Sequence, residues 1–190
     1  MKQAGGFTFF FRESDPFSNW YCSQFQIRGI TFNCVEQYMM FYKAMLFGDE
    51  PTAQKIMQAA HPKQQKALGR QVSGYDDSKW IERRMKVVTH ACVAKFSQNQ
   101  ELLEVLRMTA DTTLVEASPY DRIWGVGLGE NDPRILDPTQ WQGQNLLGKA
   151  LMEARSHLFA GVRSQVQKQS PIAKSGAPAA YQSFPSGPFM

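Results

Sequence analysis

The first third of the chain changes from a strand-like to a helix-like pattern of apolar residues. Residues 7–11 (FTFFF) and 25–33 (FQIRGITFN) are short apolar runs with interspersed polar residues, which predicts strands. The second run is interrupted by Arg28 and Gly29, which predicts the turn of a hairpin. From Val35 onward the apolar residues recur at helical spacing, which predicts a helix.

The middle of the chain carries further helix signals. Pro51 and Pro62 are each expected in the first turn of a short helix, and Asp76 is expected near the cap of a long one. The helices predicted after the first one cover residues 51–60, 62–71, 78–97, 101–108 and 146–159. A strand over 113–118 leads into an irregular segment rich in Gly, Pro and Asp.

These elements predict an α+β fold, a predominantly helical single domain with a small β-sheet, over residues 1–160. Beyond Phe159 the composition changes to Ser, Pro, Gly, Ala and Gln without apolar periodicity. Residues 161–190 are therefore expected to form a flexible tail.

Composition narrows the class of protein. Of the 190 residues, 43% are hydrophobic and 20% are charged, which is sufficient for a packed core. No apolar run approaches the roughly 20 residues that cross a bilayer, and the N-terminal residues make a poor secretory signal. We therefore expect a cytoplasmic protein that does not contact membranes. The net charge of +4 and the pI near 9.0 suit an anionic small substrate or nucleic acid, without choosing between them.

Cysteine and histidine usage indicates neither a disulfide scaffold nor a metal site. The three cysteines, Cys22, Cys34 and Cys92, are odd in number and far apart, which favours reduced structural thiols. The three histidines form no local grouping of metal ligands, although ligands from distant segments can still converge. We expect no metal and no cofactor.

The helix that begins at Val35 carries the first candidate for chemistry. Glu36 and Lys43 are seven residues apart, so they lie nearly on one line two turns from each other. Side chains lean toward the helix N-terminus, which directs the long Lys43 back toward Glu36. At a buried boundary these two groups would perturb each other's ionisation. The alternative is an ordinary solvated salt-bridge face.

The irregular segment SPYDRIWGVGLG carries the second candidate. Asp121 lies between Pro119 and Trp124, and a carboxyl group beside an indole ring can serve as a proton donor to a leaving nitrogen. The glycines that follow lack the lysine of a P-loop and the helix of a dinucleotide-binding fingerprint, which favours turn formation.

Other residues have both a structural and a functional interpretation. Trp80, on the first turn of the long helix, either covers the core or stacks on a base. Arg12 and Asn19 lie among aromatic residues, which suits the rim of a pocket as well as ordinary loop structure. Two basic clusters either hold a phosphate or form solvated helix faces: Lys63, Lys66 and Arg70, and Arg83, Arg84 and Lys86.

Taken together, the segments resemble the NADAR family of YbiA-like N-glycosidases. The resemblance runs in order from about residue 7 to 160. It rests on FFFRESDPFSNWY, VEQYMMFYKA, KALGRQV, DSKWIERRM, TLVEASPYDRIWGVGLG and WQGQNLLGKALMEAR. The resemblance implies hydrolysis of N-glycosides, either phosphoribosylamino-pyrimidines of riboflavin biosynthesis or ADP-ribosylated guanine.

The resemblance also implies roles for particular residues. Glu36, Lys43 and Asp121 match catalytic positions, and Trp80 matches an aromatic substrate-binding position. Separately from the resemblance, Arg12, Asn19 and Trp124 are further substrate-binding candidates. The expected partner is a phosphorylated, ribosylated small molecule or an ADP-ribosylated base, and no stable protein partner is inferred.

Two catalytic routes are compatible with these residues. In one, one carboxylate activates water while the other protonates the base. In the other, Lys43 forms an imine with the sugar while Glu36 shuttles protons. Two functions from other classes stay open. One is a module that binds ADP-ribose or a related nucleotide without cutting it, and the other is a nucleic-acid-binding domain, which only the pI favours.

Overall fold

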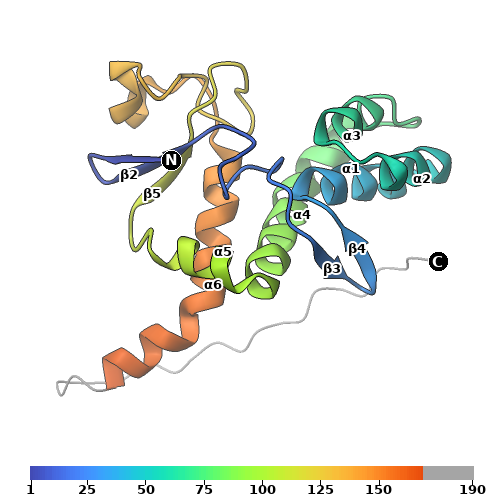
Figure 1. Cartoon of the computed structure of the whole chain (residues 1–190). Coiled ribbons are helices and arrows are strands. Elements are labelled where there is room, and N and C mark those ends of the chain that lie inside the picture. Colours follow the sequence, from blue (N-terminus) through green and yellow to red (C-terminus); the bar gives the residue numbers. More distant parts are fainter. Residues whose placement is uncertain (169–190) are drawn as a thin grey trace. The chain divides into compact units, whose positions relative to one another are not determined.

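The computed structural model describes the backbone of residues 1–168 and the side chains of residues 1–160. Met1–Ala160 form one compact unit (Figure 1). Within the described residues the elements are, in chain order, β1 (Lys2–Ala4), β2 (Phe7–Phe10), β3 (Phe25–Ile27), β4 (Ile30–Phe32), α1 (Val35–Leu46), α2 (Glu50–Gln58), α3 (Pro62–Gly69), α4 (Asp77–Gln98), α5 (Gln100–Arg107), β5 (Thr113–Glu116), the 3-10 helices η1 (Pro133–Leu136) and η2 (Pro138–Gln140), and α6 (Leu146–Lys168).

The strands form two small sheets. In the first, β2 pairs with β1 in the antiparallel sense and with β5 in the parallel sense, so that Phe10 lies opposite Glu116. The second is the β3–β4 hairpin. Arg28 and Gly29 form its turn with φ values of 51° and 78°, as a two-residue turn with two left-handed positions requires.

Local caps set the beginning of the helices that carry the candidate site. The side chains of Cys34 and His61 each accept a main-chain N–H in the first turn of α1 and α3, respectively. Asp76 caps α4 in the same way, as its position predicted. Each cap satisfies an N–H group that has no partner inside its helix.

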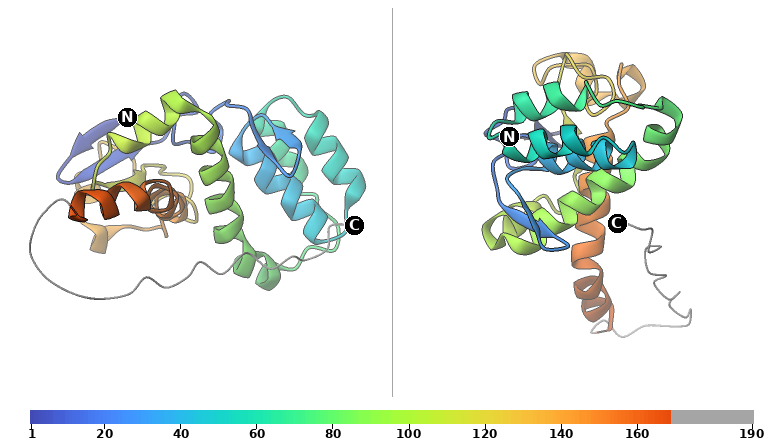
Figure 2. Two further views of the ribbon diagram at one scale, coloured as in Figure 1. Left: turned by 90° about the horizontal axis from the view of Figure 1, so that it is seen from below. Right: turned by 90° about the vertical axis from the view of Figure 1, so that its right-hand side faces the viewer.

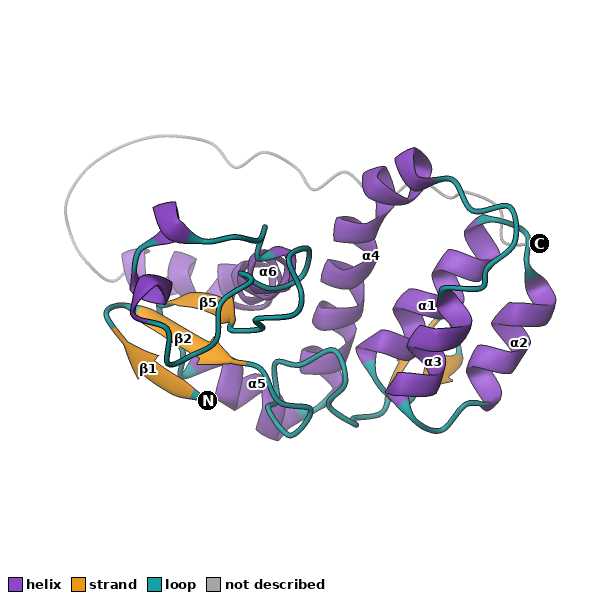
Figure 3. Ribbon diagram, turned by 90° about the horizontal axis from the view of Figure 1, so that it is seen from above, coloured by secondary structure: helices purple, strands orange, loops and turns teal. Residues whose placement is uncertain are grey.

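Helix α1 contacts α2, α3 and α4, and Figure 3 shows α1 beside α3. The α1–α3 contact is close because Gly69 has no side chain. A Cβ atom at this position would lie 2.0 Å from the Sδ atom of Met40. The close approach also brings the Gly69 carbonyl within reach of Lys43.

The loop after β5 is tied to the beginning of α6. Main-chain N–H groups of residues 144–147 donate to carbonyls of residues 122–125, which supplies acceptors for helix N–H groups that lack intrahelical partners. The Asn145 side chain donates to the Leu114 carbonyl and accepts the Glu116 N–H. In Figure 2 this loop, in yellow, lies near the first turns of α6, in orange. The segment that contains Asp121 is therefore held at both ends.

The predicted α+β, predominantly helical fold is confirmed, with three differences of detail. Strand β1 was not predicted, because Lys2–Ala4 has no alternating pattern and depends on pairing with β2. The strands form two sheets rather than one. Helix α6 continues to Lys168, past its predicted end near Phe159; of the predicted tail of residues 161–190, residues 169–190 lie outside the described part of the chain. Among the described helices, none has the length and apolar character needed to cross a membrane.

Candidate active site

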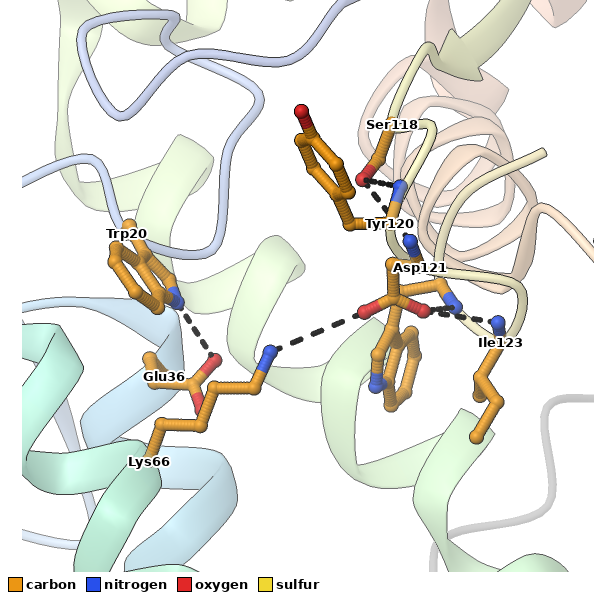
Figure 4. Close-up of polar contacts among 8 residues, drawn as sticks. Trp20, Glu36, Lys66, Ser118, Tyr120, Asp121 and Ile123 are labelled. Atoms are coloured by element: carbon orange, nitrogen blue, oxygen red, sulfur yellow. Dashed lines mark hydrogen bonds and ion pairs between the residues drawn. The ribbon is translucent and has the colours of Figure 1, made fainter. Parts of the chain in front are cut away.

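Glu36 is a buried carboxyl group in the first turn of α1, with 2% of its surface exposed. Its N–H donates to the Asn19 carbonyl at 2.9 Å, and its Oε2 atom accepts Nε1–H of Trp20 at 3.3 Å (Figure 4). Its Oε1 atom is buried and has no hydrogen-bond partner among the described residues. Burial raises the pKa of Glu36 to about 7, although the positive charge of Lys66 and the Trp20 hydrogen bond act against this rise. A carboxyl group with such a pKa can gain or lose a proton near neutral pH.

Asp121 is held rigidly in the loop after β5. Its Oδ1 atom accepts the N–H groups of Ile123 at 2.9 Å and Trp124 at 2.8 Å. Its own N–H donates to Oγ of Ser118 at 3.1 Å. With Oδ1 occupied by the main chain, Oδ2 is directed toward Lys66 (Figure 4).

Lys66 of α3 lies between the two predicted carboxyl groups. Its Nζ atom lies 3.9 Å from Oδ2 of Asp121 and 5.8 Å from the centre of the Trp20 ring, and its charge lowers the pKa of Glu36. Figure 4 shows the Lys66 amine between the carboxyl groups of Glu36 and Asp121. The structure therefore brings Glu36 and Asp121, which are 85 positions apart in the sequence, to opposite sides of one ammonium group.

Glu116, at the end of β5, is a third carboxyl group of this site. Its Oε2 atom is buried and lacks a hydrogen-bond partner among the described residues. Burial is the main cause that raises the pKa of Glu116 to about 8; the negative charges of Asp121 and Glu36 add to the rise, and Lys66 opposes it. Burial and the neighbouring negative charges thus favour retention of protons on Glu36 and Glu116 near neutral pH, while the charge of Lys66 opposes it.

Lys43 does not extend to Glu36 as the helical spacing suggested. Its Nζ atom donates to the Gly69 carbonyl at 2.8 Å and lies over the Tyr75 ring, 4.1 Å from its centre. Burial lowers the pKa of Lys43, which increases the fraction of neutral, nucleophilic amine. The centre of the Trp80 ring is 6.0 Å from the same amine. Lys43 and Trp80 therefore lie together, beside but not within the group formed by Glu36, Lys66 and Asp121.

The remaining predicted substrate-binding residues have different surroundings. Trp80 is 7% exposed and belongs to the main core, and Trp124 packs partly buried against the same core. Asn19 is buried, and its Oδ1 atom has no hydrogen-bond partner among the described residues. Arg12 is exposed, and its main-chain N–H donates to Asp15. Asn19 thus adjoins Glu36 directly, whereas Arg12 has no such link to it.

Sequence patterns alone do not identify three members of this group as site residues. Trp20 belongs to a family motif without standing out in it, Lys66 fits an ordinary basic helix face, and Glu116 lies in a predicted strand. The sequence does contain a signal for Glu116, since a carboxylate in the apolar run TLVEAS is costly to bury unless other groups compensate its charge. In the part of the chain that the structure describes, no group of three His, Cys, Asp or Glu side chains is arranged to hold a metal ion.

Comparison with known proteins gives consistent matches over most of the chain. Residues 9–159 match the family described as the NADAR domain. The chain is 36% identical over 185 residues to protein irg-1 of Caenorhabditis elegans, which covers 86% of this chain and 87% of that protein. It is 40% identical over 144 residues to N-glycosidase R617 of Acanthamoeba polyphaga mimivirus, with coverage of 73% and 85%. The NMR structure of the E. coli protein YbiA superposes with a TM-score of 0.67 at 28% identity, covering 87% of this chain and 89% of that one.

Proposed function

The chain belongs to the NADAR family, as its motifs predicted, and we propose that its site hydrolyses the N-glycosidic bond of a ribose-phosphate-bearing substrate. One observation carries the proposal. The buried carboxyl group of Glu36 and the anchored carboxylate of Asp121 face the same ammonium group, that of Lys66. Viral and bacterial relatives named N-glycosidases support the reaction class.

Cleavage of an N-glycoside requires a proton for the leaving nitrogen and stabilisation of positive charge at the anomeric carbon. Glu36, whose burial raises its pKa to about 7, is suited to hold and donate that proton. The carboxylate of Asp121 is suited to stabilise the cation or to activate water, in the division of labour between two carboxyl groups that glycosidases use. Lys66 balances part of the negative charge before the substrate enters.

Unpartnered oxygens in the site support a ligand that can both donate and accept hydrogen bonds. Oε1 of Glu36, Oε2 of Glu116 and Oδ1 of Asn19 are all buried without partners among the described residues. Buried polar atoms normally have hydrogen-bond partners, so groups of a bound ligand would satisfy these oxygens. Ribose hydroxyl groups both donate and accept hydrogen bonds. We propose phosphoribosylamino-pyrimidine intermediates of riboflavin biosynthesis or ADP-ribosylated guanine as the substrate.

The positions of Lys43 and Lys66 are compatible with two catalytic routes. In the water route, one carboxylate activates water and the other protonates the departing base. In the imine route, an amine attacks the anomeric carbon of the ring-opened sugar, the base departs with a proton from Glu36, and water then hydrolyses the imine. The lowered pKa of Lys43 supports Lys43 as the attacking amine, and the position of Lys66 supports its electrostatic role.

An assay of base release tests the proposal and separates it from simple recognition. The full chain is incubated with a panel of phosphoribosylated and ADP-ribosylated compounds, free base is quantified by chromatography, and binding is measured in parallel by calorimetry. We expect catalytic release of base from at least one compound over many turnovers. Binding without release would instead identify a module that recognises ADP-ribose or a related nucleotide. Failure of every compound to bind would refute the substrate class.

A further inference from the structure

Lys95 of α4 is a buried lysine without a carboxylate partner. Its side chain is 1% exposed, and it forms no salt bridge within the described residues. Burial lowers the pKa of Lys95 to about 8. Lysine is rarely buried to this extent, because removal of an ammonium group from water is costly unless other groups replace its solvation.

Two main-chain carbonyls solvate this ammonium group. Nζ of Lys95 donates to the carbonyl of Pro16 at 2.7 Å and to that of Ser18 at 3.2 Å. The Tyr21 ring adds a cation–π contact, with its centre 5.0 Å from Nζ. These three partners belong to residues 16–21, and the Phe96 ring of α4 adds a further contact, with its centre 5.4 Å from Nζ. Lys95 therefore binds several parts of one short loop.

The same loop positions Glu36. The Oγ atom of Ser18 accepts the N–H of Trp20 at 3.1 Å, and the Trp20 indole N–H donates to Oε2 of Glu36 at 3.3 Å. The Asn19 carbonyl accepts the N–H of Glu36 at 2.9 Å. Hydrogen bonds thus link the ammonium group of Lys95 to the Ser18 carbonyl, the Ser18 hydroxyl group to Trp20, and Trp20 to the carboxyl group of Glu36, and the covalent chain of the loop joins these bonds in one series.

We propose that Lys95 is a positioning residue for the active site, which fixes the 16–21 loop so that the Trp20 indole N–H stays on the Glu36 carboxyl group. The inference rests on the proposed role of Glu36. A hydrogen bond from an indole N–H favours the ionised carboxylate. Lys95 therefore helps to set the pH range over which Glu36 carries its proton, without touching the substrate itself.

The charged groups that act on Glu36 from other elements are unaltered by a change at position 95. They are Lys66 and Arg70 at and after α3, Asp121 in the loop after β5, and Glu116 at the end of β5. Their effects stay in place when Lys95 is replaced. A changed pKa of Glu36 then results either from movement of the 16–21 loop or from loss of the Lys95 charge, and the test must separate these two causes.

The test monitors the carboxyl carbon of Glu36 by NMR through a pH titration of the full chain. A hydrogen bond is worth roughly 1 kcal/mol and one pKa unit about 1.36 kcal/mol, so Lys95→Met should raise the titration midpoint by about 0.5 to 1 pH unit. Trp20→Phe, which removes the indole N–H directly, should produce a similar rise. The exposed Lys149 on α6 provides the control, and Lys149→Met should leave the midpoint unchanged.

The double variant distinguishes positioning from charge. If Lys95 acts through Trp20, Lys95→Met in the Trp20→Phe background causes no further shift. An equal shift in both backgrounds would show a direct charge effect and overturn the proposal. If Lys95→Met does not fold, Ser18→Ala breaks the same series of bonds while Lys95 stays in place, and an unchanged midpoint in Ser18→Ala likewise overturns it.

The NMR measurement does not depend on turnover, so it keeps this inference distinguishable from the proposed function. A shifted midpoint in a protein that releases no base would support the positioning role and refute the N-glycosidase role. In an active protein, the falling limb of the kcat–pH profile should move by the same amount as the NMR midpoint.

Discussion

Replacement of Glu36 by glutamine should stabilise the fold at neutral and alkaline pH. Glu36 is buried, and its pKa rises from 4.5 to about 7 on folding. The folded state therefore binds the Glu36 proton more tightly than the unfolded chain does. The stability that this proton contributes is fully present below pH 4.5 and is lost as the pH rises to about 7.

The size of the pKa rise gives the magnitude of this effect. Each pKa unit corresponds to about 1.36 kcal/mol, so the rise from 4.5 to about 7 corresponds to about 3 kcal/mol of folding free energy at pH 8. Glutamine is neutral at every pH and keeps an acceptor for the Trp20 indole N–H. Glu36→Gln should thus be more stable than the wild type by on the order of 2–3 kcal/mol at pH 8 and about equally stable at pH 4.

Urea unfolding of both proteins between pH 4 and pH 8, monitored by tryptophan fluorescence, gives the required free energies. Glu82→Gln on α4 is the matched control, because Glu82 is exposed. A stability difference between Glu36→Gln and the wild type that does not vary with pH would show that folding does not raise the pKa of Glu36, and so would a less stable variant at pH 8.

Three further predictions concern the neighbours of Glu36. Glu116→Gln should also stabilise the fold, increasingly as the pH rises from 4.5 to about 8, since burial raises the pKa of Glu116 from 4.5 to about 8, and the same urea titration detects it. Lys66→Met removes the positive charge between the carboxyl groups and should move the falling limb of the kcat–pH profile to higher pH; an unmoved limb would exclude this electrostatic role. If the imine route operates, borohydride added during turnover should attach the sugar to Lys43, and mass spectrometry of the peptides identifies the modified lysine. An unmodified Lys43 together with a nearly fully active Lys43→Arg variant would support the water route.

Local signals explain why the elements were predictable from the sequence. Asp76 before the long helix and the prolines at positions 51 and 62 act within a few residues of themselves, and the corresponding helices α4, α2 and α3 begin where these signals indicated. The Arg28–Gly29 turn is equally local. Strand β1 has no such local signal, because its three residues form a strand only by pairing with β2.

The site was only partly predictable, because contacts between distant segments create it. Spacing along α1 places Lys43 on the same face as Glu36, but it contains no information about the Gly69 carbonyl that α3 presents to the amine. The raised pKa of Glu116 likewise depends on charges brought in from α1, α3 and the loop that holds Asp121. Sequence patterns identify candidate groups, whereas their protonation depends on tertiary burial.

The rate of base release by Glu36→Gln and Asp121→Asn shows whether these two carboxyl groups are catalytic. Both changes keep the size of the side chain and remove its charge and most of its ability to transfer protons. General acid–base catalysis contributes about a hundredfold to ten-thousandfold, so kcat should fall by that order in each variant. Circular dichroism should meanwhile show an intact fold. Release of base by both folded variants at close to the wild-type rate would contradict the assignment of Glu36 and Asp121 to catalysis.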